Sequence, residues 1–183
     1  MGVQTPKAFF MGLTDFKIDI VRAWRMVRAC LHLLPMAAAA TVAQAGGVDS
    51  AQACRVVWAV VGAPTGREAL LVVLSPRMPY ALQEWPRMRD AATAEGFQVI
   101  AGRDPRVPLP EWEAAVVASG RADLTTAPAV DADAAARCGL FNHFPSALVG
   151  RCGQVHSWPV LGVMPDAAWL EVLRRRRESM PCA

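Results

Sequence analysis

An unbroken apolar run at residues 70–74, Leu-Leu-Val-Val-Leu, constrains the fold of this chain more than any other stretch. A run without polar positions is typical of a strand that is covered on both faces, as central parallel strands are. Ser75-Pro76 closes the run, and residues 79–94 are compatible with a helix. A strand that leads through a short turn into a helix predicts a parallel crossover unit. In α/β folds functional residues usually lie at the carboxyl end of such a strand, so residues 75–86 are the main candidates for a functional site.

The composition fits one globular domain with an extension. The chain has 183 residues, of which 54% are hydrophobic and 19% charged, and this balance argues against disorder. The net charge of +3 is too small to indicate a nucleic-acid partner. Much of the excess comes from residues 174–177, four arginines at the end of a predicted helix, where cations are favourable and the rest of the run is solvated. Binding of nucleic acid or anionic lipid by these arginines is the weaker alternative.

Residues 26–45 have the pattern of a secretory signal peptide, with a basic start, an apolar middle and an Ala-x-Ala ending before Gly46. We therefore expect an N-terminal extension with a signal peptide at 1–45 and an exported domain at 46–183. Met26 as the true start and a long basic leader are both compatible with this pattern. An uncleaved membrane anchor is the alternative, because the stretch is about long enough to span a bilayer. The predicted location is the periplasm, or the inner membrane with the domain facing the periplasm, and membrane contact is expected only through this segment.

The exported part alternates strand and helix patterns. Residues 54–61 are β-branched and aromatic and predict a strand, with a buried helix as the alternative. Further strands are predicted at 70–74, 97–101, 146–149 and 154–158, and helices at 79–94, 111–119, 131–138 and from Asp166 to the arginines. This order predicts an α/β fold in which helices flank both faces of a mixed β-sheet.

Three features between residues 54 and 175 together resemble the thioredoxin superfamily. The strand, turn and helix at 70–86 stand where thioredoxins and glutaredoxins carry Cys-x-x-Cys. Phe144-Pro145 followed by a strand resembles the cis-proline of the family. The turn at 151–155 and the helix from Asp166 resemble its C-terminal unit. The resemblance implies a thioredoxin-like mixed sheet flanked by helices.

At the turn, the resemblance sets residues 78–81, Met-Pro-Tyr-Ala, against the glutaredoxin-type Cys-Pro-Tyr-Cys. Glu84 and Pro86 also match the exported TlpA/ResA-like thioredoxins, which carry Cys-x-x-Cys-x-x-Glu-x-Pro. In the family the first cysteine attacks a disulfide as a thiolate and the second resolves the mixed disulfide. Because the thioether of Met78 cannot ionise and Ala81 has no sulfur, dithiol–disulfide exchange at this turn is chemically excluded.

The resemblance therefore implies a surface that binds without reacting. In the family an extended polypeptide lies beside the cis-proline, in a geometry of strand addition that needs no sulfur. The predicted groove residues are Met78, Pro79, Tyr80, Ala81, Trp85, Phe144 and Pro145. We expect an exported, redox-inactive protein that binds a polypeptide partner or assists envelope assembly, for example in a conjugation or secretion system. The alternatives are a divergent thiol–disulfide oxidoreductase or peroxidase that uses another thiol such as Cys138, and a structural envelope subunit.

The five cysteines are Cys30, Cys54, Cys138, Cys152 and Cys182. They form no Cys-x-x-Cys pair and no zinc-finger spacing, so we expect no structural metal site and no cofactor. Cys54 and Cys152 are both predicted at the end of the sheet far from the turn, where a disulfide between them is possible, but buried free thiols are the favoured interpretation. His143 is expected to hydrogen-bond within its loop, and Glu84 to be a surface carboxylate.

Overall fold

The structure is a computed structural model that describes residues 40–78 and 80–182. One compact unit spans Thr41–Ala183. Most of the predicted signal segment lies outside the described residues, and the domain boundary at residue 46 stays a prediction. Among the helices that are described, none combines the length and the apolar character needed to cross a membrane.

Five strands form one mixed sheet in which β1 is central. β1 (Ala69–Leu74) pairs in parallel with β2 (Gln98–Arg103) and antiparallel with β3 (Ser146–Arg151). The short strands β4 (Gln154–Val155) and β5 (Val160–Leu161) both pair with β3, which gives the order β2-β1-β3-β4 with β5 off this path. All six residues of β1 are buried, so the central strand predicted at 70–74 is confirmed.

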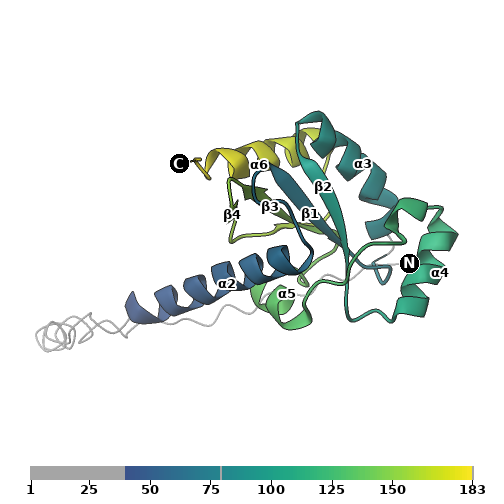
Figure 1. Cartoon of the computed structure of the whole chain (residues 1–183), viewed down its shortest axis with the longest axis horizontal. Coiled ribbons are helices and arrows are strands. Elements are labelled where there is room, and N and C mark those ends of the chain that lie inside the picture. Colours follow the sequence, from purple (N-terminus) through teal and green to yellow (C-terminus); the bar gives the residue numbers. More distant parts are fainter. Residues whose placement is uncertain (1–39, 79, 183) are drawn as a thin grey trace, which may run out of the picture. The chain divides into compact units, whose positions relative to one another are not determined.

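Helices cover both faces of this sheet (Figure 1). α3 (Ala81–Ala94) and α6 (Asp166–Glu178) contact each other on one face, whereas α2 (Ala40–Val60) and α5 (Ala132–Cys138) lie on the other. Between β2 and α5 the chain forms α4 (Leu109–Ser119) and the single 3₁₀ turn η1 (Ala122–Leu124). The architecture is the predicted α/β fold with a mixed sheet flanked by helices, and its strand order is thioredoxin-like.

The helix ends follow the local signals in the sequence. The Asp131 carboxylate accepts a hydrogen bond from the Ala134 N–H at 2.8 Å, so it caps α5 as predicted. Gly120 and Gly139 adopt left-handed conformations directly after α4 and α5, which a side chain would disfavour. These caps set where the loops toward the candidate site begin.

The strand predicted at 54–61 is wrong, because this segment is the last part of α2. Its buried residues are Ala53, Cys54, Val57 and Trp58, and this spacing is helical. Arg55 points to solvent and donates to the Gln52 side chain three residues earlier, as neighbours on a helix surface do. The β-branched residues favour a strand locally, but burial of one helical face against the sheet outweighs that preference.

Candidate functional site

Residues 75–80 join the carboxyl end of β1 to the first turn of α3. We call this segment the redox turn, because the resemblance sets it against the Cys-x-x-Cys turn of the thioredoxins. The Met78 N–H donates to the Ser75 carbonyl at 3.2 Å, and the Ala81 N–H donates to the Met78 carbonyl at 3.0 Å. Met78 is half-buried against the core, Ala81 is buried, and Tyr80 is 66% exposed. Pro79 lies outside the described residues. The side chains that the turn presents are therefore a thioether and a phenol, and neither performs thiolate chemistry.

The Phe144–Pro145 peptide bond is cis, as the resemblance predicted, and it lies beside this turn. Pro145 directly precedes β3, whose first residue pairs with Val73 near the end of β1. The Pro145 carbonyl accepts a hydrogen bond from the Gly162 N–H at 2.8 Å. The backbone N–H and carbonyl of Phe144 form no backbone hydrogen bond with any other described residue. The His143 ring packs against Gly162, where an added Cβ would lie 2.7 Å from its Cδ2 atom.

An open depression lies between the first turns of α3 and the loop that leads into α6. It is lined by Glu84, Arg87, Val163, Met164, Pro165 and Asp166. Val163 follows Gly162, the residue that donates to Pro145, so the depression borders the cis-proline loop. We take the redox turn, the cis-proline and this depression together as the candidate site.

The Arg87 guanidinium links the two walls of the depression. Its Nε donates to Glu84 at 2.5 Å, Nη1 donates to Asp166, and Nη2 donates to the Met164 carbonyl at 3.0 Å. Burial lowers the pKa of Arg87, but the hydrogen bonds to Glu84 and Asp166 outweigh it, so the pKa lies above its ordinary value. Glu84, expected to be a surface carboxylate, is partly exposed, and it also holds Arg87 in place.

A buried carboxylate and an arginine were not predicted at this end of the sheet. Asp104 follows β2, and its N–H donates to the Leu74 carbonyl at the end of β1 at 2.9 Å. The Arg106 side chain donates to both Asp104 oxygens, at 2.9 and 3.0 Å, and its guanidinium lies 3.9 Å from the centre of the Phe141 ring. The sequence did carry a signal for them, because Asp104 and Arg106 follow the carboxyl end of β2, which runs parallel to β1.

The Asp104 carboxyl is held in its charged form. Burial raises the pKa of Asp104, but hydrogen bonds from the Arg106 side chain and backbone outweigh that effect and place the pKa below its ordinary value. The Arg106 guanidinium also lies 5.6 Å from the Phe144 ring, so this ion pair covers the aromatic residue before the cis-proline.

Trp85 does not line the predicted groove. It is 4% exposed, and its Nε1–H donates to the Asp123 carboxylate of η1 at 2.6 Å. Arg89 also donates to Asp123, at 2.7 Å, and its guanidinium lies 5.9 Å from the Trp85 ring. The indole therefore anchors η1 to α3. Among the other predicted groove residues, Ala81, Phe144 and Pro145 are buried, so Tyr80 and the half-buried Met78 provide the exposed side chains.

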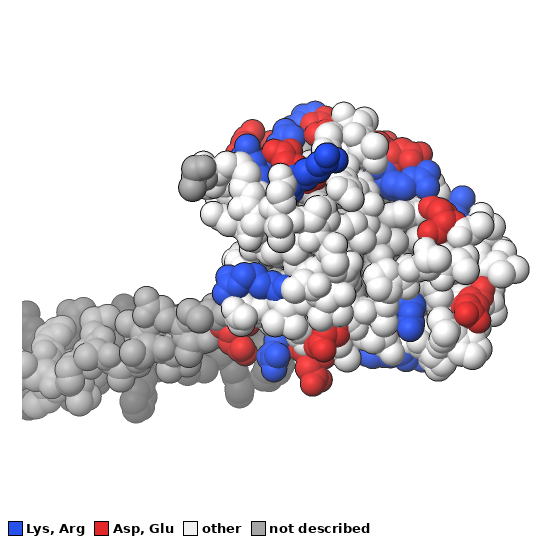
Figure 2. Space-filling model, in the orientation of Figure 1, with Lys and Arg blue, Asp and Glu red and all other residues white. Residues whose placement is uncertain are grey.

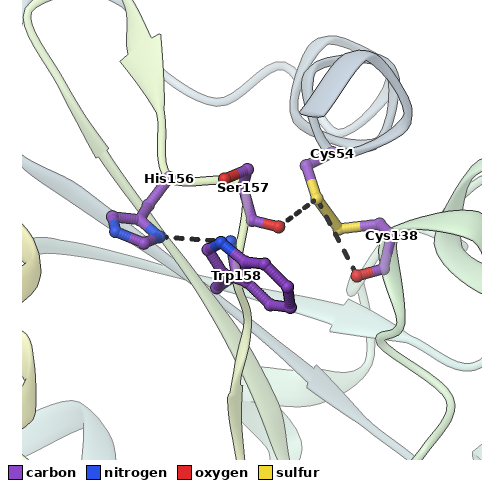
Figure 3. The surroundings of a disulfide bond; sticks show 5 residues. All are labelled: Cys54, Cys138, His156, Ser157 and Trp158. Carbon is purple, nitrogen blue, oxygen red and sulfur yellow. Dashed lines mark hydrogen bonds between the residues drawn. A yellow bond between two sulfur atoms is a disulfide. The ribbon is translucent and has the colours of Figure 1, made fainter. Parts of the chain in front are cut away.

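The structure contains two disulfides, Cys54–Cys138 and Cys152–Cys182. The favoured interpretation of free thiols is therefore wrong. The possible Cys54–Cys152 pairing is wrong as well, because Cys54 lies on α2 and is bonded to Cys138 at the end of α5. Cys54 and Cys138 are buried, at 0% and 2% exposure, and the Cys54 sulfur lies 3.6 Å from the Ser157 carbonyl (Figure 3). The Cys152–Cys182 pair is exposed and ties the C-terminal tail to the β3–β4 turn. Every cysteine in the described part of the chain is therefore oxidised.

Residues 40–78 and 80–182 hold no cluster of three or more His, Cys, Asp or Glu side chains that could bind a metal ion. The side chains at the candidate site are instead apolar or engaged in ion pairs, as Arg87 and Arg106 are. What the arrangement offers chemically is a framework of backbone groups, apolar surface and fixed charges.

Comparison with known proteins finds distant likeness to thioredoxins and disulfide oxidoreductases of known structure. Mycobacterium tuberculosis DsbF, solved in mixed oxidised and reduced forms, is 20% identical, with 63% of this chain and 82% of that chain covered and a TM-score of 0.45. The exposed lipoprotein thioredoxin of Streptococcus pneumoniae is 15% identical, with 61% and 86% covered and a TM-score of 0.46. A secreted M. tuberculosis disulfide oxidoreductase, homologous to Escherichia coli DsbE, is 17% identical, with 62% and 83% covered and a TM-score of 0.39.

No protein-family model matches the sequence. No curated protein sequence matches it either. The assignment of a thioredoxin-like fold therefore rests on the strand order, the central strand and the cis-proline loop of the structure itself.

Proposed function

We propose that this chain is an exported, redox-inactive thioredoxin-like protein that binds an extended polypeptide at the candidate site. The observation that supports this most is the combination of an intact site geometry with a turn that has no sulfur nucleophile. The turn from β1 to α3, the cis-proline and the depression are all in place, while positions 78 and 81 are Met and Ala.

The proposed mode of binding is strand addition beside Phe144. Main-chain hydrogen bonds hold an added strand, and they require unpaired backbone groups at the binding edge. The Phe144 backbone has no backbone partner among the described residues. The neighbouring Pro145 carbonyl already accepts from Gly162, which fixes the loop in position. Tyr80, 66% exposed, supplies an aromatic surface with few rotatable bonds for side chains of the partner.

The alternative oxidoreductase that uses Cys138 is disfavoured. A reactive cysteine needs a thiolate that solvent can reach, but Cys138 is 2% exposed and bonded to Cys54. The Cys152–Cys182 pair is exposed, but it lies at the β3–β4 turn, at the opposite end of β3 from Pro145. Neither pair can serve as the missing thiols of the redox turn.

Export of the chain is supported by two independent features. Disulfides persist in oxidising compartments and are rare in the cytosol, and the described part of this chain contains two. Residues 26–45 have a signal-peptide pattern. We propose the periplasm as the location and a polypeptide of the cell envelope as the partner.

Site-specific photo-crosslinking in cells tests the binding proposal. A photoreactive phenylalanine analogue replaces Tyr80 in the full chain, and the control places it at Val117, which is 80% exposed on α4. We expect a discrete light-dependent polypeptide adduct from position 80 that is absent from position 117. Equal adducts at both positions, or none at position 80, would contradict the proposal.

A further inference from the structure

The four consecutive arginines of α6 are not uniformly solvated. Three have carboxylate partners, in the pairs Arg174–Glu95, Arg175–Glu171 and Arg177–Glu68, at 2.5, 2.7 and 3.3 Å. In agreement with this, Figure 2 shows basic and acidic side chains side by side over the α6 and α3 side of the molecule. Arg176 has no carboxylate within 4.0 Å among the described residues, and its Nη1 lies 3.1 Å from the Nε2 atom of His156.

Two groups that can only donate hydrogen bonds face the two ring nitrogens of His156. The backbone N–H of Trp158 donates to the Nδ1 atom at 3.1 Å (Figure 3). A neutral imidazole has a single acceptor nitrogen, so it can accept from only one of these two donors. We assign that role to Nδ1, which places the proton of the neutral ring on Nε2. Burial, and then the charge of Arg176, lower the pKa of His156 and favour this neutral form.

Two hydrogen-bond donors therefore face each other between α6 and the segment after β4. The Nε2–H of His156 and the guanidinium of Arg176 both need an acceptor, and neither can serve as one. They border a pocket of 330 Å³ lined by His156, Val172, Arg175, Arg176 and Ser179. The Arg175 guanidinium is already paired with Glu171, so Arg176 supplies the uncompensated positive charge of this pocket.

We propose that this pocket binds a phosphate group, whose oxygens accept hydrogen bonds from His156 Nε2–H and the Arg176 guanidinium. A phosphate oxygen within reach of both groups would replace a donor–donor contact by two hydrogen bonds, one of them charge-assisted. The planar guanidinium fork matches phosphate oxygens, and Arg175 at the rim offers further donors. The pocket shares no lining residue with the depression beside the cis-proline, so this proposal stands independently of the proposed function.

Thermal unfolding with inorganic phosphate tests the pocket in the full chain. Sodium chloride at equal ionic strength serves as the reference. A ligand that binds the folded state raises the melting temperature in a saturable, concentration-dependent manner. We expect this rise in the native protein and in the control variant Arg174→Gln. The native Arg174 side chain pairs with Glu95 and does not line the pocket. In Arg176→Gln we expect the apparent affinity for phosphate to fall at least tenfold. An equal rise in Arg176→Gln, or no rise in the native protein, would overturn the proposal.

The tautomer and the source of the phosphate group are tested separately. A long-range ¹H–¹⁵N spectrum of the free protein is expected to show His156 as the Nε2–H tautomer, with resonances that shift on phosphate addition. The Nδ1–H tautomer would overturn the proposal.

Sedimentation with phosphatidylglycerol vesicles distinguishes a lipid headgroup from a soluble phosphate. Pelleting that Arg176→Gln abolishes would assign a headgroup, and phosphate binding without pelleting would assign a soluble phosphate. Pelleting that Arg176→Gln leaves unchanged would contradict the pocket as the headgroup site.

Discussion

Gly150 on β3 lies directly under the indole of Trp58, which is 4% exposed. A Cβ atom at Gly150 would lie 2.2 Å from the Cζ2 atom of that ring. We expect Gly150→Ala to lower the free energy of unfolding by about 1–3 kcal/mol, because the indole must leave its packed position. Urea denaturation measures this. Gly66→Ala is the control, since no atom lies within 4 Å of its added Cβ. Equal effects of the two substitutions would contradict the packing of α2 on β3.

The pH dependence of stability tests the Asp104–Arg106 pair. The pKa of Asp104 is lowered in the folded state, so its contribution to stability is present above the unfolded-state pKa and is lost as the pH falls through the folded-state value. We expect Asp104→Asn to lower the free energy of unfolding at pH 7 by about 1–3 kcal/mol, because the Arg106 donors lose their charged acceptor.

Urea midpoints at pH 7 and pH 3 measure the Asp104 effect. The difference between the two midpoints is expected to be smaller in Asp104→Asn than in the native protein. The control is Asp90→Asn, whose carboxylate is 67% exposed. If Asp104→Asn and the native protein lose the same stability on acidification, the ion pair does not stabilise the fold as described.

At the scale of elements, β1, α3, β2 and the caps of α5 could be predicted because their signals are local. An apolar run such as 70–74, or a glycine after a helix such as Gly139, carries its structural preference within a few residues. α2 could not be predicted from residue type, since its β-branched residues favour a strand. The helical spacing of Cys54, Val57 and Trp58 is the signal that distinguishes a helix from a strand in this segment.

The disulfide pairing depends on α2 and was therefore mispredicted together with it. A strand at 54–61 places Cys54 at the end of the sheet near Cys152, whereas a helix places it on the face of the sheet beside Cys138. Cysteine pairing follows from tertiary position, which the order of cysteines in a sequence does not determine.

Removing the buried disulfide tests how strongly α2 is held. The Cys54→Ser/Cys138→Ser variant is expected to lose about 2–5 kcal/mol of unfolding free energy, since the bond joins residues 84 positions apart and both sulfurs are buried. Chemical denaturation under non-reducing conditions measures this loss. The Cys152→Ser/Cys182→Ser variant is the matched control, because it removes an exposed bond between residues 30 positions apart. A larger loss in the control would contradict the central role of the α2–α5 bond.

At the scale of the molecule, the position of the candidate site could be predicted but much of its lining could not. The site lies where a buried strand ends beside a cis-proline, and both features are visible in the sequence. Trp85 turns away from it because Asp123 of η1 accepts its indole N–H, and residues 121–130 carried no periodic signal. Arg87 and Arg106 reach the site through ion pairs whose partners become known only from the fold.

The thioredoxin-like frame without thiols makes a direct prediction about chemistry. Residues 78 and 81 are the third residue before α3 and its first residue, so cysteines there would have the Cys-x-x-Cys spacing at a helix N-terminus that lowers a thiol pKa. Met78→Cys/Ala81→Cys is therefore expected to introduce dithiol–disulfide exchange without any other change. Tyr80 and the neighbouring loops stay as they are in this variant.

Turnover in an insulin-reduction assay tests the central claim most directly. The native protein is predicted to show no turnover above the uncatalysed rate, because its four described cysteines are held in disulfides and positions 78 and 81 carry no thiol. The Met78→Cys/Ala81→Cys variant is predicted to catalyse the reduction. Clear turnover by the native protein, abolished by Cys152→Ser or Cys138→Ser, would contradict the account of a site that binds without reacting.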